Sequence, residues 1–357
     1  MTEIFLTIFF ISVLLFFLGS GIWVALSMIG VSAIGMMLFT SRPVGDAMAT
    51  TIWGTSSSWT LTALPLFVWM GEILFRTKLS ENLFKGLSPW MQKLPGGLIH
   101  VNVVGCALFA AISGSSAATV ATVGKMSIPE LRKRKYPEKI LLGSLAGSGT
   151  LGLLIPPSII LIIYGVAVQE SIAKLFIAGI IPGIMIALIF MSYVIIWSLI
   201  NKKEMPKILE EYSFLEKIKR SKQLLPVILL ILAVIGSIYT GIATATEAAS
   251  LGVVGALILS YFQKSLTLET FKSSLLGATK TSCMIAFILA GSTFLSLAMG
   301  FTGLPRNLAI WIQNMDLSPY VLIFVLMIFY IILGMFLDGI SAVVLTMAII
   351  EPMIRQA

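Results

Sequence analysis

The sequence predicts an all-α protein that crosses a lipid bilayer several times. Hydrophobic residues make up 58% of the 357 residues and charged residues only 11%, and the mean hydropathy is +1.01. Soluble domains of this size are much less apolar. Apolar runs of about 20 residues, the length that spans a bilayer as a helix, recur along the whole chain. Little of the sequence is left for a soluble domain.

The apolar runs give the expected membrane crossings in chain order. They cover residues 4–18, 22–39, 172–200, 224–239, 251–262 and 281–299. The first run has neither a basic lead nor a small-residue cleavage site, so we expect a retained helix and not a removed signal peptide. We expect 172–200 to return to the cytoplasm, 224–239 to leave it, 241–262 to come back and 281–299 to leave again.

The basic residues orient the chain in the membrane. Of the 24 Lys and Arg residues, 17 fall within 76–93, 125–139 and 202–222. By the positive-inside rule these three segments face the cytoplasm, and we expect the N-terminus on the opposite side of the membrane. Because the net charge of +8 is explained by these loops, we expect no nucleic-acid partner.

The segment between the first two basic regions cannot be one crossing, because both of its ends face the cytoplasm. We therefore expect a re-entrant hairpin at 96–125 that turns at Ser113, Gly114, Ser115 and Ser116 and returns as a half-helix over 117–125. Ser and Gly tolerate turns, and Ser caps helix N-termini. Irregular backbone at membrane depth survives where protein or a watery cavity satisfies it. The alternative is one spanning helix kinked by small residues.

Residues 139–168 predict a broken helix. A straight helix of this length would measure about 45 Å, well beyond a hydrocarbon core of about 30 Å. Its middle reads GSGTLGLLIPPS, in which Pro156 and Pro157 remove two backbone donors and clash with the preceding turn. We expect freed carbonyl groups near the bilayer midplane beside the hairpin tip. The alternative is a purely structural kink.

Residues 333–354 repeat the hairpin pattern of residues 108–131. Each copy has an apolar arm, a polar and Gly tip, a small apolar arm and a proline. The spacing from Ser115 to Pro129 equals that from Asp338 to Pro352. The connection 303–319, with Arg306 as its one basic residue, is expected outside, so the copies enter from opposite faces. Inverted repeats of this kind are typical of secondary transporters.

This repeat divides the chain into four segments. They are N-terminal scaffold helices (1–75), a first transport repeat (76–170, with the broken helix 139–168), further scaffold helices with a cytoplasmic loop at 201–223 (171–265), and a second transport repeat (266–357). A second broken helix would be expected after Pro352 and is absent from the sequence. We therefore expect a sequence truncated after the second hairpin.

Hydroxyl groups and freed carbonyls at the hairpin tip suit Na⁺, and the positive ends of half-helices suit a carboxylate. With His100 as the sole histidine and no Walker motif, we expect no transition-metal site and no nucleotide-driven step. Asp338 either adds charge to a cation site or caps the next half-helix. Glu247 is expected to cap a helix, and Glu72 to pair with Arg76 four residues later.

Six stretches together closely resemble the large, DctM-type membrane subunit of tripartite ATP-independent periplasmic (TRAP) transporters. They are PLFVWMGEIL, GGLIHVNVVGCALFAAISGSSAATVATVG, IPPSIILIIYG, LFIAGIIPG, TATEAAS and LGMFLDGIS. The resemblance covers essentially the whole chain. It implies an elevator-type permease, driven by a Na⁺ gradient, that imports carboxylate-bearing solutes such as C4-dicarboxylates or sialic acid. It also implies a periplasmic solute-binding protein and a small four-helix membrane subunit as partners.

The resemblance also implies site residues. For Na⁺ they are Ser113, Gly114, Ser115, Gly149, Thr150, Ile155, Pro156, Asp338, Gly339 and Ser341. For the solute we expect Ser115, Ser116, Thr119 and Asn102. The alternative to a binding-protein-dependent permease is a self-sufficient dicarboxylate or anion symporter with Na⁺. A channel or an intramembrane enzyme is disfavoured, since the chain lacks a nucleophile, base and acid constellation.

Overall fold

The computed structural model describes residues 2–76, 79–206, 212–222, 224–313, 318–335 and 339–356. Over these residues the regular structure consists of seventeen α-helices and three short 3-10 helices, without a strand. The prediction of an all-α protein is therefore confirmed.

The helices follow one another in this order: α1 (Thr2–Gly19), α2 (Val24–Phe39), α3 (Val44–Ser56), α4 (Ala63–Phe75), α5 (Leu79–Met91), α6 (Ile99–Ser113), α7 (Ser116–Lys133), α8 (Glu138–Gly149), α9 (Ile159–Val168), α10 (Ile172–Ile200), α11 (Phe214–Ser221), α12 (Leu225–Tyr239), α13 (Ala245–Phe262), α14 (Leu268–Thr302), α15 (Leu304–Gln313), α16 (Pro319–Gly334) and α17 (Gly339–Gln356). The 3-10 helices are η1 (Trp59–Thr62), η2 (Thr150–Leu153) and η3 (Lys202–Glu204).

Several helices have the length and composition of membrane spans. Among the described residues, α10, α13 and α14 are long and apolar enough to cross a bilayer. Shorter apolar helices are Phe5–Gly19, Val24–Phe39, Ile99–Ser113, Ile159–Val168 and Pro319–Gly334. Large apolar side chains such as Ile181 and Leu188 on α10 are exposed, as expected of side chains that contact lipid. These features agree with a polytopic membrane protein.

Contacts divide the chain into two compact units, each described by itself. One unit contains residues 1–61, 166–169 and 282–357, and the other contains residues 62–165 and 170–281. The first hairpin and the break before α9 lie in the second of these units. Helices α16 and α17, on either side of the expected second tip, lie in the first. The expected division into scaffold and transport segments stays a prediction.

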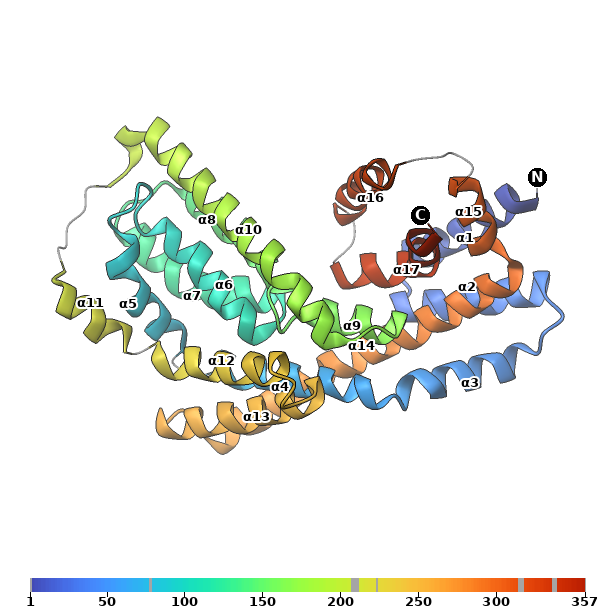
Figure 1. Cartoon of the computed structure of the whole chain (residues 1–357), viewed down its shortest axis with the longest axis horizontal. Coiled ribbons are helices and arrows are strands. Elements are labelled where there is room, and N and C mark those ends of the chain that lie inside the picture. Colours follow the sequence, from blue (N-terminus) through green and yellow to red (C-terminus); the bar gives the residue numbers. More distant parts are fainter. Residues whose placement is uncertain are drawn as a thin grey trace. The chain divides into compact units, whose positions relative to one another are not determined.

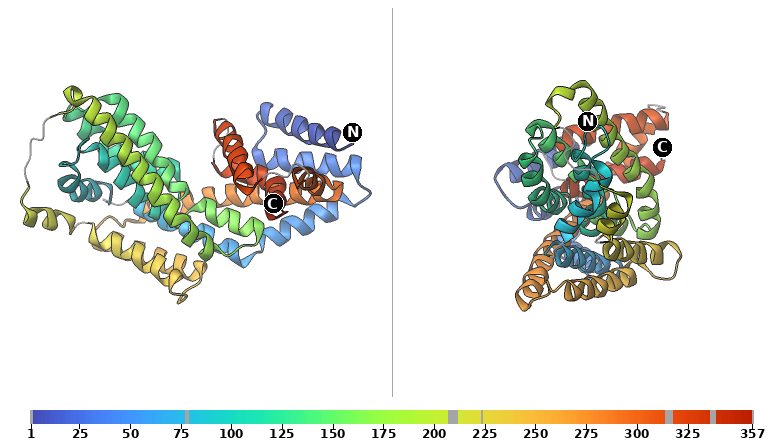
Figure 2. Two further views of the ribbon diagram at one scale, coloured as in Figure 1. Left: turned by 45° about the horizontal axis from the view of Figure 1, so that its top comes forward. Right: turned by 90° about the vertical axis from the view of Figure 1, so that its left-hand side faces the viewer.

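Helix α4 forms the centre of the unit that holds the first hairpin. Apart from Glu72 it consists of apolar residues, and its buried side chains include Leu64, Phe67 and Met70. A helix that is apolar all round is a buried helix. It packs against α13 and α6, and Phe67 meets Phe176 of α10 edge to face at 6.0 Å. Figure 2 shows α12 and α13 together at the edge of this unit, and α12 packs on α13.

The first hairpin packs beside the broken helix. Helices α6 and α7 lie side by side, α8 contacts both, and the long α10 runs along α6 and α8 (Figure 1). The chain therefore reverses between Ser113 and Ser116 and does not continue as one kinked helix, which supports the hairpin over its alternative.

The structure corrects three predicted boundaries. Helix α7 continues to Lys133 instead of ending at 125, because the polar segment after Lys125 is itself helical. Helix α14 begins at Leu268 and not at 281, because the mixed polar segment before the apolar run is helical and Thr267 accepts a hydrogen bond from the amide of Thr270. The expected outer connection 303–319 contains the ten-residue helix α15.

We expect Phe176→Ala to lower the free energy of unfolding by about 3 kcal/mol, because it leaves a cavity beside Phe67. Phe262→Ala is the matched control, since that ring is exposed at the end of α13. Thermal unfolding of the purified protein in detergent measures both. Equal unfolding temperatures for the two variants would show that the contact between Phe67 of α4 and Phe176 of α10 does not stabilise the unit.

Candidate functional site

The tip of the first hairpin is built by a glycine and a serine cap. Helix α6 ends at Ser113, and Gly114 follows in the left-handed conformation with φ 57°, its amide donating to Ala110 at 3.0 Å. Gly adopts this conformation without the steric cost that a Cβ brings. Ser115 is extended, and its hydroxyl accepts from the amide of Ala118, which caps α7. The serine capping expected from the sequence is present.

Hydroxyl groups at the tip form a local network. The Ser113 hydroxyl lies 2.9 Å from that of Thr119, and the Thr119 hydroxyl donates to the carbonyl oxygen of Ser115 at 2.7 Å. Thr119 is completely buried, and Ser115 and Ser116 are half-buried. The tip thus gathers neutral oxygen atoms at the start of α7, where the helix dipole is positive.

The helix break opposite the tip has the expected form. Helix α8 ends at Gly149, η2 follows, and α9 begins only at Ile159. The peptide bond between Pro156 and Pro157 is cis, and the Ser158 hydroxyl donates to the carbonyl of Leu153. The predicted break in the segment 139–168 is confirmed.

Tip and break are in direct contact. A Cβ added at Gly152 would stand 2.9 Å from the carbonyl carbon and oxygen of Ser115. A Cβ at Gly114 would stand 2.9 Å from the carbonyl oxygen of Pro157. A Cβ at Gly149 would overlap the side chain of Val120. Of the residues expected around the first cation site, Gly114, Ser115 and Gly149 lie where the tip and the break meet. Thr150 is exposed, and its hydroxyl donates to the carbonyl of Gly147 at 2.7 Å.

Neighbouring helices approach this place through further glycines. Gly71 of α4 faces the backbone of Ser113, where an added Cβ would stand 3.0 Å from its Cα atom. On α10, an added Cβ at Gly179 would stand 2.8 Å from the carbonyl oxygen of Leu154. Neither glycine is among the residues expected at the site, although both lie in the motifs PLFVWMGEIL and LFIAGIIPG that carry the family resemblance.

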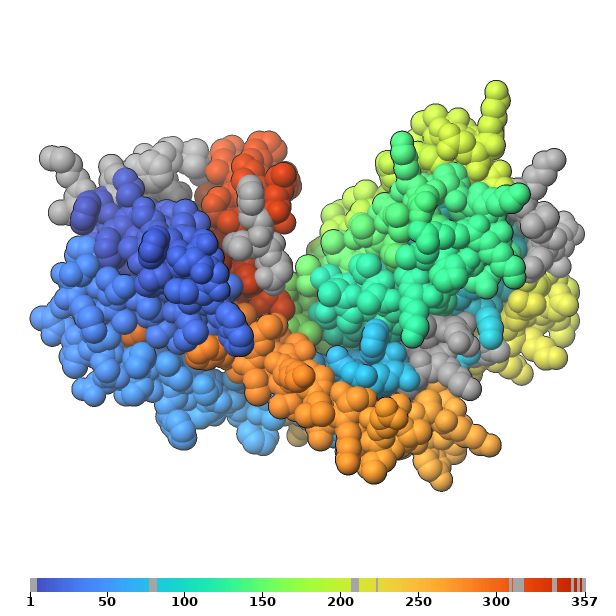
Figure 3. Space-filling model, turned by 180° about the vertical axis from the view of Figure 1, so that it is seen from behind, coloured from blue at the N-terminus to red at the C-terminus, as the bar shows by residue number. Residues whose placement is uncertain are grey.

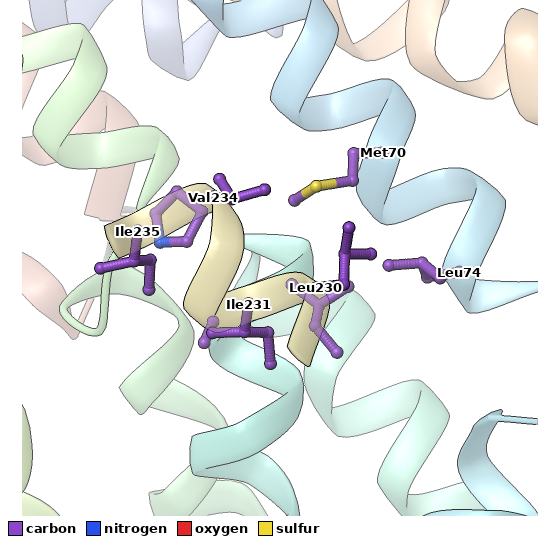
Figure 4. Close-up of a pocket in the computed structure, with 9 residues that line it drawn as sticks. Met70, Leu74, Leu230, Ile231, Val234 and Ile235 are labelled. Carbon is purple, nitrogen blue, oxygen red and sulfur yellow. The ribbon is translucent and has the colours of Figure 1, made fainter. Parts of the chain in front are cut away.

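An apolar layer closes one side of the tip. A cavity of only about 10 Å³ lies between α4, α12, the end of α6 and Pro157. In Figure 4, Met70 and Leu74 of α4 lie opposite Leu230 and Val234 of α12. A void of this size without polar atoms does not hold water. Access to the tip through this layer would require the helices to move.

Asn102 lies away from the tip. It is about 16 Å from Ser113 along α6 at 1.5 Å per residue. The side-chain amide of Asn102 is buried and donates to Leu141 and to the hydroxyl of Ser144, both on α8, while its Oδ1 has no partner among the described residues. These hydrogen bonds join α6 to α8. The expected contact of Asn102 with the solute stays a prediction. His100 lies at the hairpin base, hydrogen-bonded to Pro95 at 2.8 Å.

The second set of expected cation ligands belongs to the other unit. Asp338 lies outside the described residues, Gly339 begins α17, and Ser341 is buried within it. The hydroxyls of Tyr330 and Thr346 meet at 2.6 Å and join α16 to α17. Ser292 of α14 donates to the carbonyl of Val344 at 2.7 Å.

The predicted roles of the acidic residues outside the tips are confirmed. Glu72 pairs with Arg76 at 2.9 Å, and Glu247 forms a capping box with Thr244 at the start of α13. Among the described residues, no group of three or more His, Cys, Asp or Glu side chains gathers as a metal site would require. The tip and the break carry no charged side chain, so what they offer a ligand is neutral oxygen and main-chain dipoles.

The sequence of the chain is similar to those of known transporter subunits. The family described as the DctM component of the tripartite ATP-independent periplasmic transporters matches residues 9–357. A C4-dicarboxylate TRAP transporter large permease protein of Pseudomonas aeruginosa is 34% identical over 88% of this chain and 73% of its own length. The sialic acid TRAP transporter large permease protein of Vibrio cholerae is 31% identical over 93% and 77%. The isethionate TRAP transporter permease protein DctMQ of Oleidesulfovibrio alaskensis is 29% identical over 95% and 53%.

We expect Gly114→Ala to lower the free energy of unfolding by at least about 1–2 kcal/mol, the cost of a Cβ in the left-handed conformation, with the contact to Pro157 in addition. Gly143→Ala is the control, because a Cβ there meets no atom within 4 Å. Thermal unfolding of both purified variants is the measurement. If Gly114→Ala and Gly143→Ala unfolded at the same temperature, the backbone of the tip would not be constrained by its contact with the break.

Proposed function

The chain belongs to the DctM component family of the tripartite ATP-independent periplasmic transporters, and from this membership we propose that it imports a carboxylate-bearing solute by Na⁺ symport. It is the large permease subunit of such a transporter and not an enzyme. The coupling ion, the class of solute and the movement of the protein are proposed in addition to this family membership.

The contact between the hairpin tip and the helix break carries the Na⁺ proposal. The hydroxyls of Ser113 and Thr119 lie 2.9 Å apart at the tip, and the main chain at Gly149 and Gly152 lies against α7 and the tip, without a charged side chain. In our proposal Thr150, Ile155 and Pro156 of the break complete this first Na⁺ site. Neutral carbonyl and hydroxyl oxygens suit Na⁺, and unwound backbone in transporters coordinates such ions. Gly339 and Ser341, with Asp338 from outside the described residues, would form the corresponding second site.

The start of α7 supports an anionic solute. Main-chain amides at a helix N-terminus and the positive end of the helix dipole favour a carboxylate. Ser115, Ser116 and Thr119 lie at this end of α7, and in our proposal they bind the solute. Two relatives are named for C4-dicarboxylates and for sialic acid, which fits a carboxylate as the common group.

The packing of the hairpin supports an elevator movement. Asn102 and Ser148 tie α6 to α8, and the tip lies against the break, so the hairpin and the broken helix are suited to move as one body. The equal spacing of the two hairpins to their prolines supports an inverted repeat. In our proposal residues 1–75 and 171–265 act as the scaffold in the bacterial inner membrane, with the N-terminus in the periplasm, and residues 266–357 belong to the second transport repeat.

Two partners complete the proposed transporter. The family name denotes a tripartite system, and this chain would work with a small four-helix membrane subunit and a periplasmic binding protein. The relative named DctMQ is much longer than the matched region, which is consistent with a second membrane part joined to it.

We expect uptake of succinate or sialic acid into vesicles that contain the chain and both partners to require an inward Na⁺ gradient. The measurement compares gradients of Na⁺ and of K⁺ at equal ionic strength. Equal uptake with a K⁺ gradient would contradict Na⁺ as the coupling ion. Uptake by this chain without its partners would instead favour the self-sufficient symporter.

We expect Ser115→Leu to reduce uptake to background while membrane insertion persists. The change removes the cap of α7 and places an apolar side chain where solute and ion are proposed to bind. Ser250→Leu is the matched control, because Ser250 is exposed on α13 and bonds only within its own helix. Wild-type uptake by Ser115→Leu would show that the tip serves packing alone.

A further inference from the structure

Helix α11 is amphipathic, and its apolar side is exposed. Phe214 is 66% exposed, Leu215 80% and Ile218 44%. With 3.6 residues per turn these three side chains fall within an arc of about 100° around the helix. The charged side chains of the helix lie outside this arc: Glu216, Lys217, Lys219 and Arg220. Figure 3 shows the yellow surface of the segment around α11 at the edge of its unit.

Helix α5 holds α11 in this orientation. The indole nitrogen of Trp90 donates to the hydroxyl of Ser221 at 2.8 Å, and the Trp90 ring meets the ring of Phe214 edge to face at 6.2 Å. The Lys217 ammonium lies 5.4 Å from the centre of the same indole ring. These contacts fix the rotation of α11 about its own axis, so the apolar arc keeps its outward direction.

The neighbouring helix α12 indicates what the apolar arc contacts. Helix α12 is one of the expected membrane crossings, and its exposed side chains Leu225, Leu229 and Leu232 form one stripe at i, i+4 and i+7. The axes of α11 and α12 differ by 58° (Figure 1). Because spanning helices are tilted on average by about 20° from the bilayer normal, α11 leans toward the membrane plane at the end of this crossing.

The lipid bilayer is the partner that fits both helices. Basic residues on one side of a helix and Phe or Leu on the other are typical of a helix that lies in the membrane interface. In water the three apolar side chains would remain unfavourably hydrated. A protein partner would have to cover α11 beside the exposed stripe of α12, whereas lipid covers both helices without a break.

We propose that α11 lies in the headgroup region of the bilayer, with Phe214, Leu215 and Ile218 directed toward the acyl chains. The positive-inside rule predicts that this is the cytoplasmic surface. Through Trp90 the helix fastens the end of α5, which leads into the first hairpin, to the same surface. The assignment is independent of the proposed transport function.

Spin labels on the full chain in lipid nanodiscs of phosphatidylethanolamine and phosphatidylglycerol test the orientation of α11. Cys283→Ser removes the exposed cysteine, and Cys106 is buried. Single labels are placed at Ile218→Cys and at its control Arg220→Cys, which lies about 200° further around the helix. Power saturation with oxygen and with a water-soluble nickel complex measures the depth of each label. We expect the label at 218 about 5–10 Å below the phosphates and the label at 220 on the water side.

Two results would overturn the proposal. If the nickel complex reached both labels equally, the segment would be a solvated loop. If neither reagent reached the label at 218, protein would cover the apolar arc in place of lipid.

Trypsin cleavage of the full chain in the same nanodiscs tests the anchoring itself. We expect the double variant Leu215→Ser and Ile218→Ser to be cleaved after Lys217, Lys219 or Arg220 at least about tenfold faster than the wild type, because its helix leaves the interface more often. The matched control Leu215→Met and Ile218→Leu keeps the side chains apolar and should be cleaved at the wild-type rate. Unfolding temperatures show whether both variants are folded. Equal cleavage rates for the two double variants would contradict anchoring by these side chains.

Discussion

A chain surrounded by lipid has no water to satisfy the polar main-chain groups at a helix end, so each helix end inside the membrane must meet other parts of the protein. The hairpin tip and the helix break meet this requirement together. The end of α6 is closed by Gly114, the start of α7 is capped by Ser115, and both lie against the backbone between Gly149 and Pro157.

This contact requires the surrounding backbones to come very close. Gly152 brings η2 onto the main chain of Ser115, and Gly71 and Gly179 bring α4 and α10 onto the tip and the break. In lipid, helices associate through such close packing and not through burial of apolar surface. The glycines therefore contribute to the site indirectly, by setting the distance at which the neighbouring helices stand.

The parts of this arrangement that depend on local chemistry could be predicted from the sequence. The cluster Ser113–Ser116 and the pair Pro156–Pro157 disfavour a continuous helix. The two basic loops on either side of residues 97–124 predict that the chain reverses direction in this segment. The limits of α14 and the role of Asn102 could not be predicted in this way. Helix α14 continues through polar residues that a search for apolar runs leaves out, and Asn102 makes contacts with α8 that no local pattern reveals.

The buried polar seam between α6 and α8 has a consequence for how the molecule changes shape. Asn102 of α6 donates to Leu141 and Ser144 of α8, and its carbonyl accepts from Ser148, so the two helices are joined around this one residue, well below the tip. Separating them would expose polar groups with no replacement partner, so the hairpin cannot act as a flap that opens against a stationary broken helix. In the proposed transport cycle, a solute released toward the cytoplasm would therefore leave a pocket whose walls keep their shape, and the barrier to its release would be set by the surface on which that rigid body slides.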